Sequence, residues 1–194
     1  LTGCTVARCL AEAGFGVTIV EQESTPGGLC ADAKQPDYVQ FFGPHIFHSN
    51  ETDVWRFVSR FGPWVAYTHR VLAKKVDDFF PIPINLTTVE KFFNVSFRHR
   101  RDSEKFMKGK LANVSIDTAR GVLETRIGTE LTDAFFEHYS RKQWGVTLGE
   151  LVPEVASRIP VYFDRSRLYY GMQRCGFPRH GFSSFCLFLL DHPN

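Results

Sequence analysis

The stretch GCTVARCLAEAGFGVTIVEQESTPGG, residues 3–28, decides the fold of this chain. Small and apolar residues recur at helical spacing over 4–13, and Gly14 gives that helix a glycine at its C-terminal end. The β-branched run over residues 17–20 predicts a short buried strand, which Glu21 closes. A glycine turn, a helix, a strand and an acid in this order predict the later part of a βαβ unit and hence an α/β fold.

The same stretch predicts a dinucleotide site. Gly3 stands where the third glycine of a GxGxxG turn permits close packing of helix on strand, and the helix N-terminus offers N–H groups to a pyrophosphate. Glu21 is placed to bind ribose hydroxyls, and the pair Gly27-Gly28 lets the backbone pass close to a ligand. This spacing favours FAD over NAD. The alternative is an ordinary packing glycine and a surface glutamate.

Outward from this stretch, an amphipathic helix is expected over 52–61, capped by Thr52 or Asp53. Residues 65–80 favour a hairpin with a charged turn, and the region up to Tyr139 is rich in helix formers. The predicted organisation is a Rossmann-like FAD-binding segment (1–64), a hairpin of an antiparallel sheet (65–86), an inserted helical substrate domain (87–157), a mobile substrate loop (158–180) and a return to the FAD domain (181–194).

Composition narrows the class of protein. The 194 residues carry 23 Lys+Arg and 21 Asp+Glu, a net charge of +2 that favours no nucleic-acid partner. No run approaches the roughly 18 apolar residues of a membrane span. Five cysteines without a CxxC motif predict free buried thiols in a cytoplasmic setting. The basic cluster at 98–101 is expected to be a solvated face. Because the chain starts at Leu1, we expect the true N-terminus to lie upstream.

Residues 43–49, Gly-Pro-His-Ile-Phe-His-Ser, are the densest chemical segment. His45 and His48 would need a helix to share a metal, which Pro44 opposes, and no further ligand completes a set. Near a flavin, either histidine could donate to ring carbonyls. Trp144, followed by Gly145 at a helix end, suits either a flap over a planar ligand or a hydrophobic anchor. No catalytic Ser/His/Asp set is visible.

The segments GPHIFHSN, YSRKQWG and RIPV occur in this order and resemble motifs of the UDP-galactopyranose mutase family over essentially the whole chain. The resemblance implies non-covalently bound FAD in its reduced form and isomerisation of UDP-galactopyranose to UDP-galactofuranose through a flavin N5–sugar adduct, without net redox change. It also implies UDP-galactose as substrate, NAD(P)H or another reductant, a role in cell-wall polysaccharide biosynthesis, and a homo-oligomer as one assembly. It covers the N-terminal half of such an enzyme, so we expect this chain alone to be inactive.

The resemblance also assigns roles by position. Gly3, Glu21, Gly27 and Gly28 match the dinucleotide fingerprint, and Gly43, His45, Phe47 and His48 match the segment beneath the flavin ring. Asn85 matches an asparagine on the substrate side of the flavin, and Tyr139 and Trp144 match aromatic residues of the substrate cleft.

The departures fall in the substrate loop. Tyr162 stands where the family often has an arginine after RIPV, and Arg165 is the candidate to replace it. Arg174 stands where a cleft tyrosine is common. A mutase-like FAD oxidoreductase of the amine-oxidase type, or a non-catalytic flavin- or nucleotide-sugar-binding remnant, remains the alternative.

Overall fold

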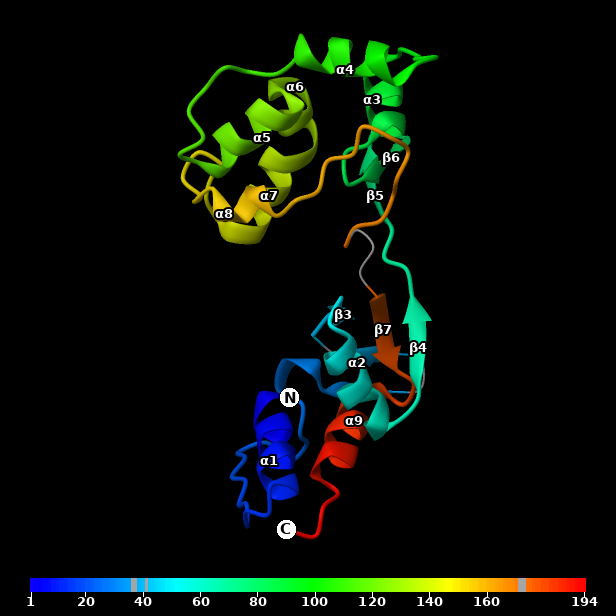
Figure 1. Ribbon diagram of the computed structural model, residues 1–194. Helices are drawn as coiled ribbons and strands as arrows, with labels where there is room; N and C mark the ends of the chain where they lie inside the picture. Colours follow the sequence, from blue (N-terminus) through cyan, green and yellow to red (C-terminus); the bar gives the residue numbers. More distant parts are fainter. Residues whose placement is uncertain (36–37, 41, 171–173) are drawn as a thin grey trace. The chain divides into compact units, whose positions relative to one another are not determined.

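The computed structural model describes residues 1–35, 38–40, 42–170 and 174–194, with side chains at 33–40 left out of the description. The chain divides into two compact units (Figure 1). Unit 1 contains the described residues of 1–68 and 172–194, and unit 2 contains residues 69–171. The predicted class, a Rossmann-like α/β protein with an inserted helical domain and antiparallel sheet, is confirmed at this level.

Unit 1 joins helices and short strands from both ends of the chain. Its helices and single turns are α1 (Thr2–Glu12), a 3-10 turn (Gly28–Cys30), α2 (Thr52–Val58), a second 3-10 turn (Ser59–Phe61) and α9 (Gly181–Leu190). Its strands are β1 (Asp32–Gln35), β2 (Tyr38–Gln40), β3 (Phe47–Ser49), β4 (Trp64–Tyr67) and β7 (Arg174–Pro178). Strand β7 lies between β3 and β4, and all these pairings are antiparallel.

An aromatic cluster forms the core of unit 1. Phe47, Trp55 and Trp64 meet with ring centroids 5.0–5.4 Å apart, and Phe185 from α9 lies 5.4 Å from Trp64. Edge-to-face contacts of this kind add to the apolar area that the rings bury. Helix α9 thus packs the C-terminal part of the chain against the first segment.

Two sets of polar interactions fix the ends of helices α9 and α1 in unit 1. Asp32 Oδ2 accepts the Ser183 amide at 2.8 Å and so caps α9 from a distant strand. A Cβ on Gly181 would lie 2.2 Å from that oxygen, so glycine is required there. At the end of α1, Glu12 is clamped by Arg60 and Arg8, and these hydrogen bonds lower the pKa of Glu12 to about 2.

Unit 2 is a hairpin followed by helices. Its elements are β5 (Val71–Lys75), β6 (Asp78–Ile82), α3 (Leu86–Phe93), α4 (Arg100–Lys108), α5 (Ala119–Ile127), α6 (Thr129–Thr132), a π-helical turn (Asp133–Glu137), α7 (His138–Trp144) and α8 (Glu154–Ser157). Leu123, Ile127, Leu131 and Leu148 lie at the centre of its core with at most 1% of their surface exposed. The basic residues 98–101 are exposed, as predicted.

Several local predictions were wrong. Residues 17–20 form no strand, and Val20 is 93% exposed, because no described strand lies alongside to pair with them. Glu51, rather than Thr52 or Asp53, caps α2, since its carbonyl already accepts the Trp55 amide at 3.2 Å.

The extents of the hairpin and of the substrate loop also differ from the prediction. The hairpin spans 71–82 only, because residues 64–67 pair with β7 instead. That pairing makes residues 174–178, expected within the substrate loop, the middle strand of a sheet.

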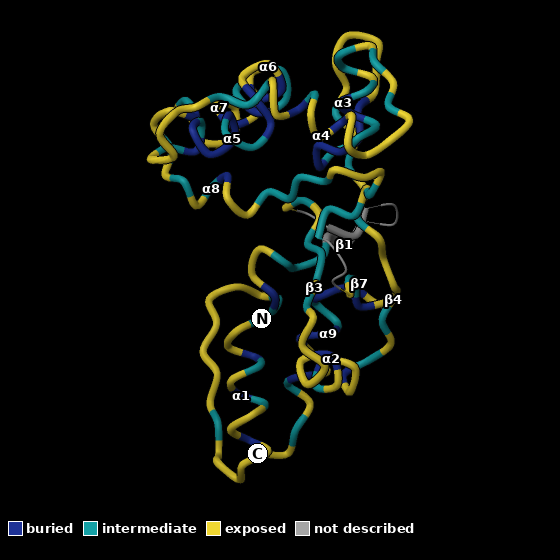
Figure 2. Tube along the Cα trace, turned by 45° about the horizontal axis from the view of Figure 1, so that its top comes forward, coloured by how far each residue is buried: buried dark blue, intermediate teal, exposed yellow. Residues whose placement is uncertain are grey.

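The five cysteines are thiols rather than disulfides, but only Cys4 and Cys186 are buried. Burial is partial at Cys30 and Cys175, and Cys9 is exposed on α1. Much of α1 is exposed, as Figure 2 shows, and its buried side is limited to small residues. Among the described residues, no helix combines the length and the apolar character that a membrane crossing requires.

Candidate functional site

The predicted dinucleotide residues lie in unit 1. Gly3 is in the first turn of α1, where no heavy atom lies within 4 Å of the position that a Cβ would take. That turn contains no acidic residue, and no side chain of the described residues caps it. Its N–H groups are therefore compatible with an anion.

The other dinucleotide residues follow in the connection to β1. Glu21 is exposed, and its Oε1 accepts the amides of Gln22 and Glu23 at 2.8 and 3.1 Å. Gly27 is buried with φ +127°, and a Cβ there would lie 3.1 Å from the Ala31 Cα, so this turn requires glycine. Gly28 follows with φ +58° and an open environment.

The segment predicted beneath a flavin ring is strand β3 and the turn before it. Gly43 has φ +100°, and His45 follows in irregular, half-buried backbone. Within β3 the side chains alternate, so that Phe47 enters the aromatic core and His48 is exposed. No group of three metal-ligating side chains occurs in the described parts of the chain.

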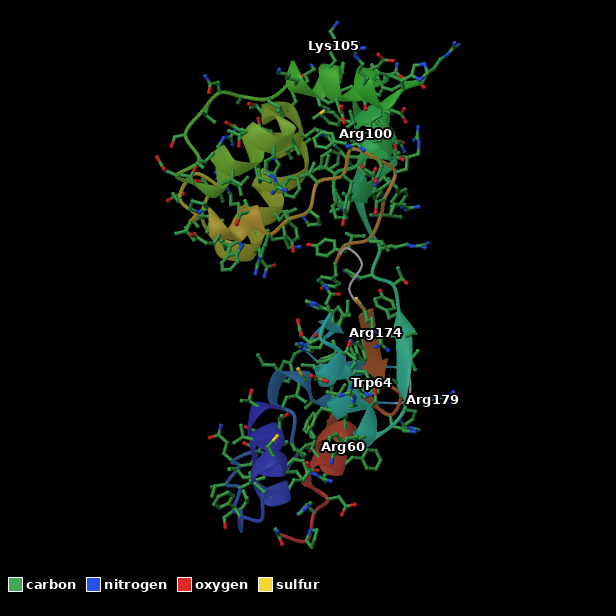
Figure 3. All side chains as sticks on the ribbon, in the orientation of Figure 1. Arg60, Trp64, Arg100, Lys105, Arg174 and Arg179 are labelled. Carbon is green, nitrogen blue, oxygen red and sulfur yellow. The ribbon has the colours of Figure 1, made fainter. Side chains whose placement is uncertain are left out.

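Strand β7 lies beside that segment. His48 is opposite Cys175 in the antiparallel register. The guanidinium of Arg174, labelled in Figure 3, lies 5.0 Å from the Trp55 ring centroid. Arg174 thus contacts an aromatic ring of unit 1 at the position where the resemblance expects a tyrosine.

The two predicted cleft aromatics are in unit 2 on α7. Tyr139 is 66% exposed and Trp144 is 50% exposed, so neither is a buried anchor. Gly145 ends α7 in the left-handed conformation, as the sequence predicts. These rings offer flat apolar faces that the core does not use.

Asn85 is completely buried at the start of α3. Its Oδ1 accepts the Thr88 amide at 3.1 Å, which caps the helix, and its Nδ2 donates to the Ser166 carbonyl at 2.8 Å. The structure thus uses Asn85 to join α3 to the segment that contains Tyr162 and Arg165. An asparagine three residues before Thr88 is a capping signal that the sequence analysis missed.

Tyr162 and Arg165 are fixed at the same place. The Tyr162 amide donates to the Ile84 carbonyl and its hydroxyl donates to the Leu168 carbonyl, both at 2.9 Å. Arg165 Nη1 lies 2.8 Å from Glu90 Oε2 and 3.2 Å from Thr87 Oγ1. Asn85, Tyr162 and Arg165 therefore lie in the same part of unit 2, and both amide atoms of Asn85 are bonded within the protein.

A second aromatic group was not predicted. His69 stacks on Tyr170 with centroids 5.5 Å apart and meets Tyr169 edge-on at 5.2 Å. Burial raises the pKa of the Tyr169 hydroxyl, the nearby Tyr139 adds to the rise, and Arg158 opposes it. Burial also lowers the pKa of His69. The sequence signal that could have predicted this aromatic group is the pair Tyr169-Tyr170, which follows the RIPV motif.

Comparison with known proteins first gives the class. Residues 1–61 match the family described as NAD(P)-binding Rossmann-like domain, which agrees with the glycines and the helix of unit 1. Residues 1–61 therefore resemble the Rossmann-like class.

The particular family follows from the other end of the chain. Residues 134–194, which include Tyr139 and Trp144, match the family described as UDP-galactopyranose mutase. The whole chain is 32% identical to a dTDP-fucopyranose mutase of Escherichia coli and 33% identical to a probable UDP-galactopyranose mutase of Klebsiella pneumoniae. It is 26% identical to a UDP-galactopyranose mutase of Mycoplasma genitalium.

The chain spans about half the length of these relatives, namely 52%, 51% and 50% respectively. The predicted resemblance is confirmed: the whole chain is similar to these mutases, and residues 134–194 match the family described as UDP-galactopyranose mutase.

Proposed function

We propose that the protein carrying this chain is an FAD-dependent mutase that interconverts the pyranose and furanose forms of a nucleotide sugar, with UDP-galactopyranose as its substrate. One observation carries the proposal: in the segment that matches the mutase family, Tyr139 and Trp144 expose half or more of their surface. Large aromatic side chains that the core does not bury suit the flat rings of a nucleotide sugar.

A dinucleotide cofactor fits unit 1. The uncapped first turn of α1, the open space at Gly3 and the tight turn at Gly27 are suited to a diphosphate that approaches the backbone closely. FAD is the proposed cofactor because an acid followed shortly by a glycine pair is the pattern of flavin-binding members of this class. When bound and reduced, flavin supplies a nucleophile for the anomeric carbon of the sugar.

The protein's own contribution is binding and orientation. The α1 N-terminus and Gly27 would hold the cofactor diphosphate, and His45 and His48 lie in the segment that would face the flavin ring. Tyr139 and Trp144 offer faces to the rings of the nucleotide sugar. The proposed reaction needs no side-chain nucleophile, because the flavin would supply it. This agrees with the absence of a catalytic triad pattern from the sequence.

A second substrate has a specific observation in its favour. The Escherichia coli relative named dTDP-fucopyranose mutase is as similar to this chain as the Klebsiella relative, at 32% against 33% identity. dTDP-fucopyranose is therefore the alternative substrate of the same reaction.

The test uses the full-length protein, chemically reduced, incubated with UDP-galactofuranose or with dTDP-fucofuranose and compared with an oxidised sample. Chromatography should show the pyranose form in the reduced sample alone, with no reductant consumed per turnover. Consumption of one reductant per turnover would identify an oxidoreductase instead. Flavin retention without turnover of either sugar would favour a binding protein.

A variant pair tests the aromatic site. Tyr139→Ala should lower kcat/KM about 5- to 150-fold, because stacking on a base is worth about 1–3 kcal/mol. Its stability should change little, since Tyr139 is 66% exposed. Val152→Ala, 59% exposed in the same unit, is the matched control. Equal activity of the two variants would exclude Tyr139 from the site.

A further inference from the structure

Within the described part of the chain, Arg165 uses one of its nitrogens, Nη1, for hydrogen bonds and ion pairs. Nη1 contacts both Glu90 Oε2 and Thr87 Oγ1, at 2.8 and 3.2 Å. Among the described residues, Nε and Nη2 have no hydrogen-bond or ion-pair partner, and 57% of the side chain is exposed. Since a guanidinium has five N–H donors in a planar fork, most of its donors remain available on the solvent side.

Glu90 is held from both sides. Its side chain is only 13% exposed, and its Oε1 accepts the Phe97 amide at 3.0 Å while Oε2 faces Arg165. A carboxylate with this little exposure is costly without a cation, so Arg165 is the partner that the site requires. Burial raises the pKa of Glu90, but the bonds from Phe97 and Arg165 outweigh it and lower the pKa.

The backbone around Arg165 is fixed as well. The Tyr162 amide donates to the Ile84 carbonyl at 2.9 Å, and the Leu86 amide donates to the Asp164 carbonyl at 2.8 Å. Asn85 holds the Ser166 carbonyl at 2.8 Å. Asp164 Oδ1 accepts the Ser166 amide at 2.7 Å, so that oxygen is engaged by the backbone.

We propose that Glu90 is a positioning residue that holds Arg165 by one nitrogen, so that the remaining guanidinium donors bind the diphosphate of a nucleoside diphosphate. The inference rests on the proposed function for the identity of the ligand. An arginine bound at one nitrogen and open at the rest is oriented before ligand arrives, which reduces the entropy lost on binding. Arginine suits a phosphate because its N–H groups match the phosphate oxygens in pairs.

Glu90→Gln should act in the same direction as Arg165→Gln and more weakly. Loss of charge-assisted hydrogen bonds to phosphate in Arg165→Gln should weaken UDP binding about 10- to 150-fold. In Glu90→Gln the cation remains but is no longer held by an ion pair, so UDP affinity should fall about 3- to 10-fold. Arg165→Lys should bind UDP as poorly as Arg165→Gln within a few-fold, because one ammonium replaces a fork that serves two partners.

The experiment measures binding of UDP, of dTDP and of uridine to the full-length protein by calorimetry. Uridine lacks phosphates, so its affinity should be the same in all variants, whereas general damage to the fold would weaken uridine and UDP together. The control pair is Arg100→Gln and Glu104→Gln, an exposed ion pair of unit 2 on α4.

Three results would overturn the inference. The first is unchanged UDP affinity in Arg165→Gln. The second is unchanged or tighter UDP binding in Glu90→Gln, which would mean that Glu90 competes with the ligand for Arg165. The third is an unmodified protein that binds neither UDP nor dTDP. If the binding pattern holds but the protein isomerises no sugar, the proposed function fails and the inference on Glu90 and Arg165 stands.

Discussion

Replacing Asn85 tests whether its side chain serves the fold through two separate bonds. Asn85→Ala removes the cap on α3, worth about 1 kcal/mol. It also leaves the Ser166 carbonyl without its donor, which costs about 1–3 kcal/mol if that group stays buried. The expected loss in the free energy of unfolding of unit 2 is therefore about 2–4 kcal/mol. Asn85→Ser keeps a capping oxygen but does not reach Ser166, so it should lose about 1–3 kcal/mol.

Thr118→Ala supplies the matched control for Asn85→Ala. Thr118 caps α5 in the same unit by accepting the Gly121 amide at 3.2 Å, and among the described residues its hydroxyl has no second bond of the kind that Asn85 makes to Ser166. Its removal should cost about 1 kcal/mol. Native-state hydrogen exchange of the core amides of α5, in the full-length protein, gives the unfolding free energy of unit 2 for each variant. Equal losses in Asn85→Ala and Thr118→Ala, with Asn85→Ser equal to the unmodified protein, would refute the role of the Ser166 bond.

Three further predictions concern other parts of the chain. Gly121→Ala should destabilise unit 2 by about 1–3 kcal/mol, because its Cβ would lie 1.8 Å from a backbone oxygen, while Gly109→Ala, with 3.4 Å of clearance, should be neutral in the same urea titration. The depressed pKa of Glu12, about 2, means that its contribution to stability is complete above its ordinary value near 4.5 and is lost as the pH falls toward 2. Between pH 5 and pH 2, the melting temperature of Glu12→Gln should fall less than that of the unmodified protein. Identical pH profiles of the two proteins would contradict this. Iodoacetamide should modify the exposed Cys9 well before Cys186, whose pKa burial raises to about 12, and mass spectrometry of peptides from the folded protein would detect the reverse order.

The sequence predicted elements whose signals are local. The helix over 4–13, the charged turn of the hairpin and the glycine after Trp144 all follow from spacing and turn chemistry within a few residues. The strand over 17–20 was wrong because a β-branched run specifies an extended backbone but does not supply the neighbouring strand.

The candidate site also shows which features local signals can predict. Sequence motifs predicted which residues belong to the site, but they did not predict the hydrogen-bond and ion-pair partners of those residues. Nothing local in the sequence links Glu90 to Arg165 or Asn85 to Ser166, because these pairs are joined only when the loop after RIPV folds against α3. Likewise, the pairing of residues 64–67 with 174–178 depends on the return of the chain to unit 1.

The contact of His69 with Tyr169 and Tyr170 has a consequence for how the chain assembles. These residues lie at the two ends of unit 2, and the Tyr169 amide donates to the His69 carbonyl at 3.3 Å. Strands β4 and β7, which pair directly, flank that unit in the chain. If roughly a hundred flexible residues separated them, closing the loop would cost about 3 kcal/mol more in chain entropy than a tight four-residue turn. A unit 2 that folds first and joins its own ends removes most of that penalty, and the whole unit then serves as the turn of a single hairpin.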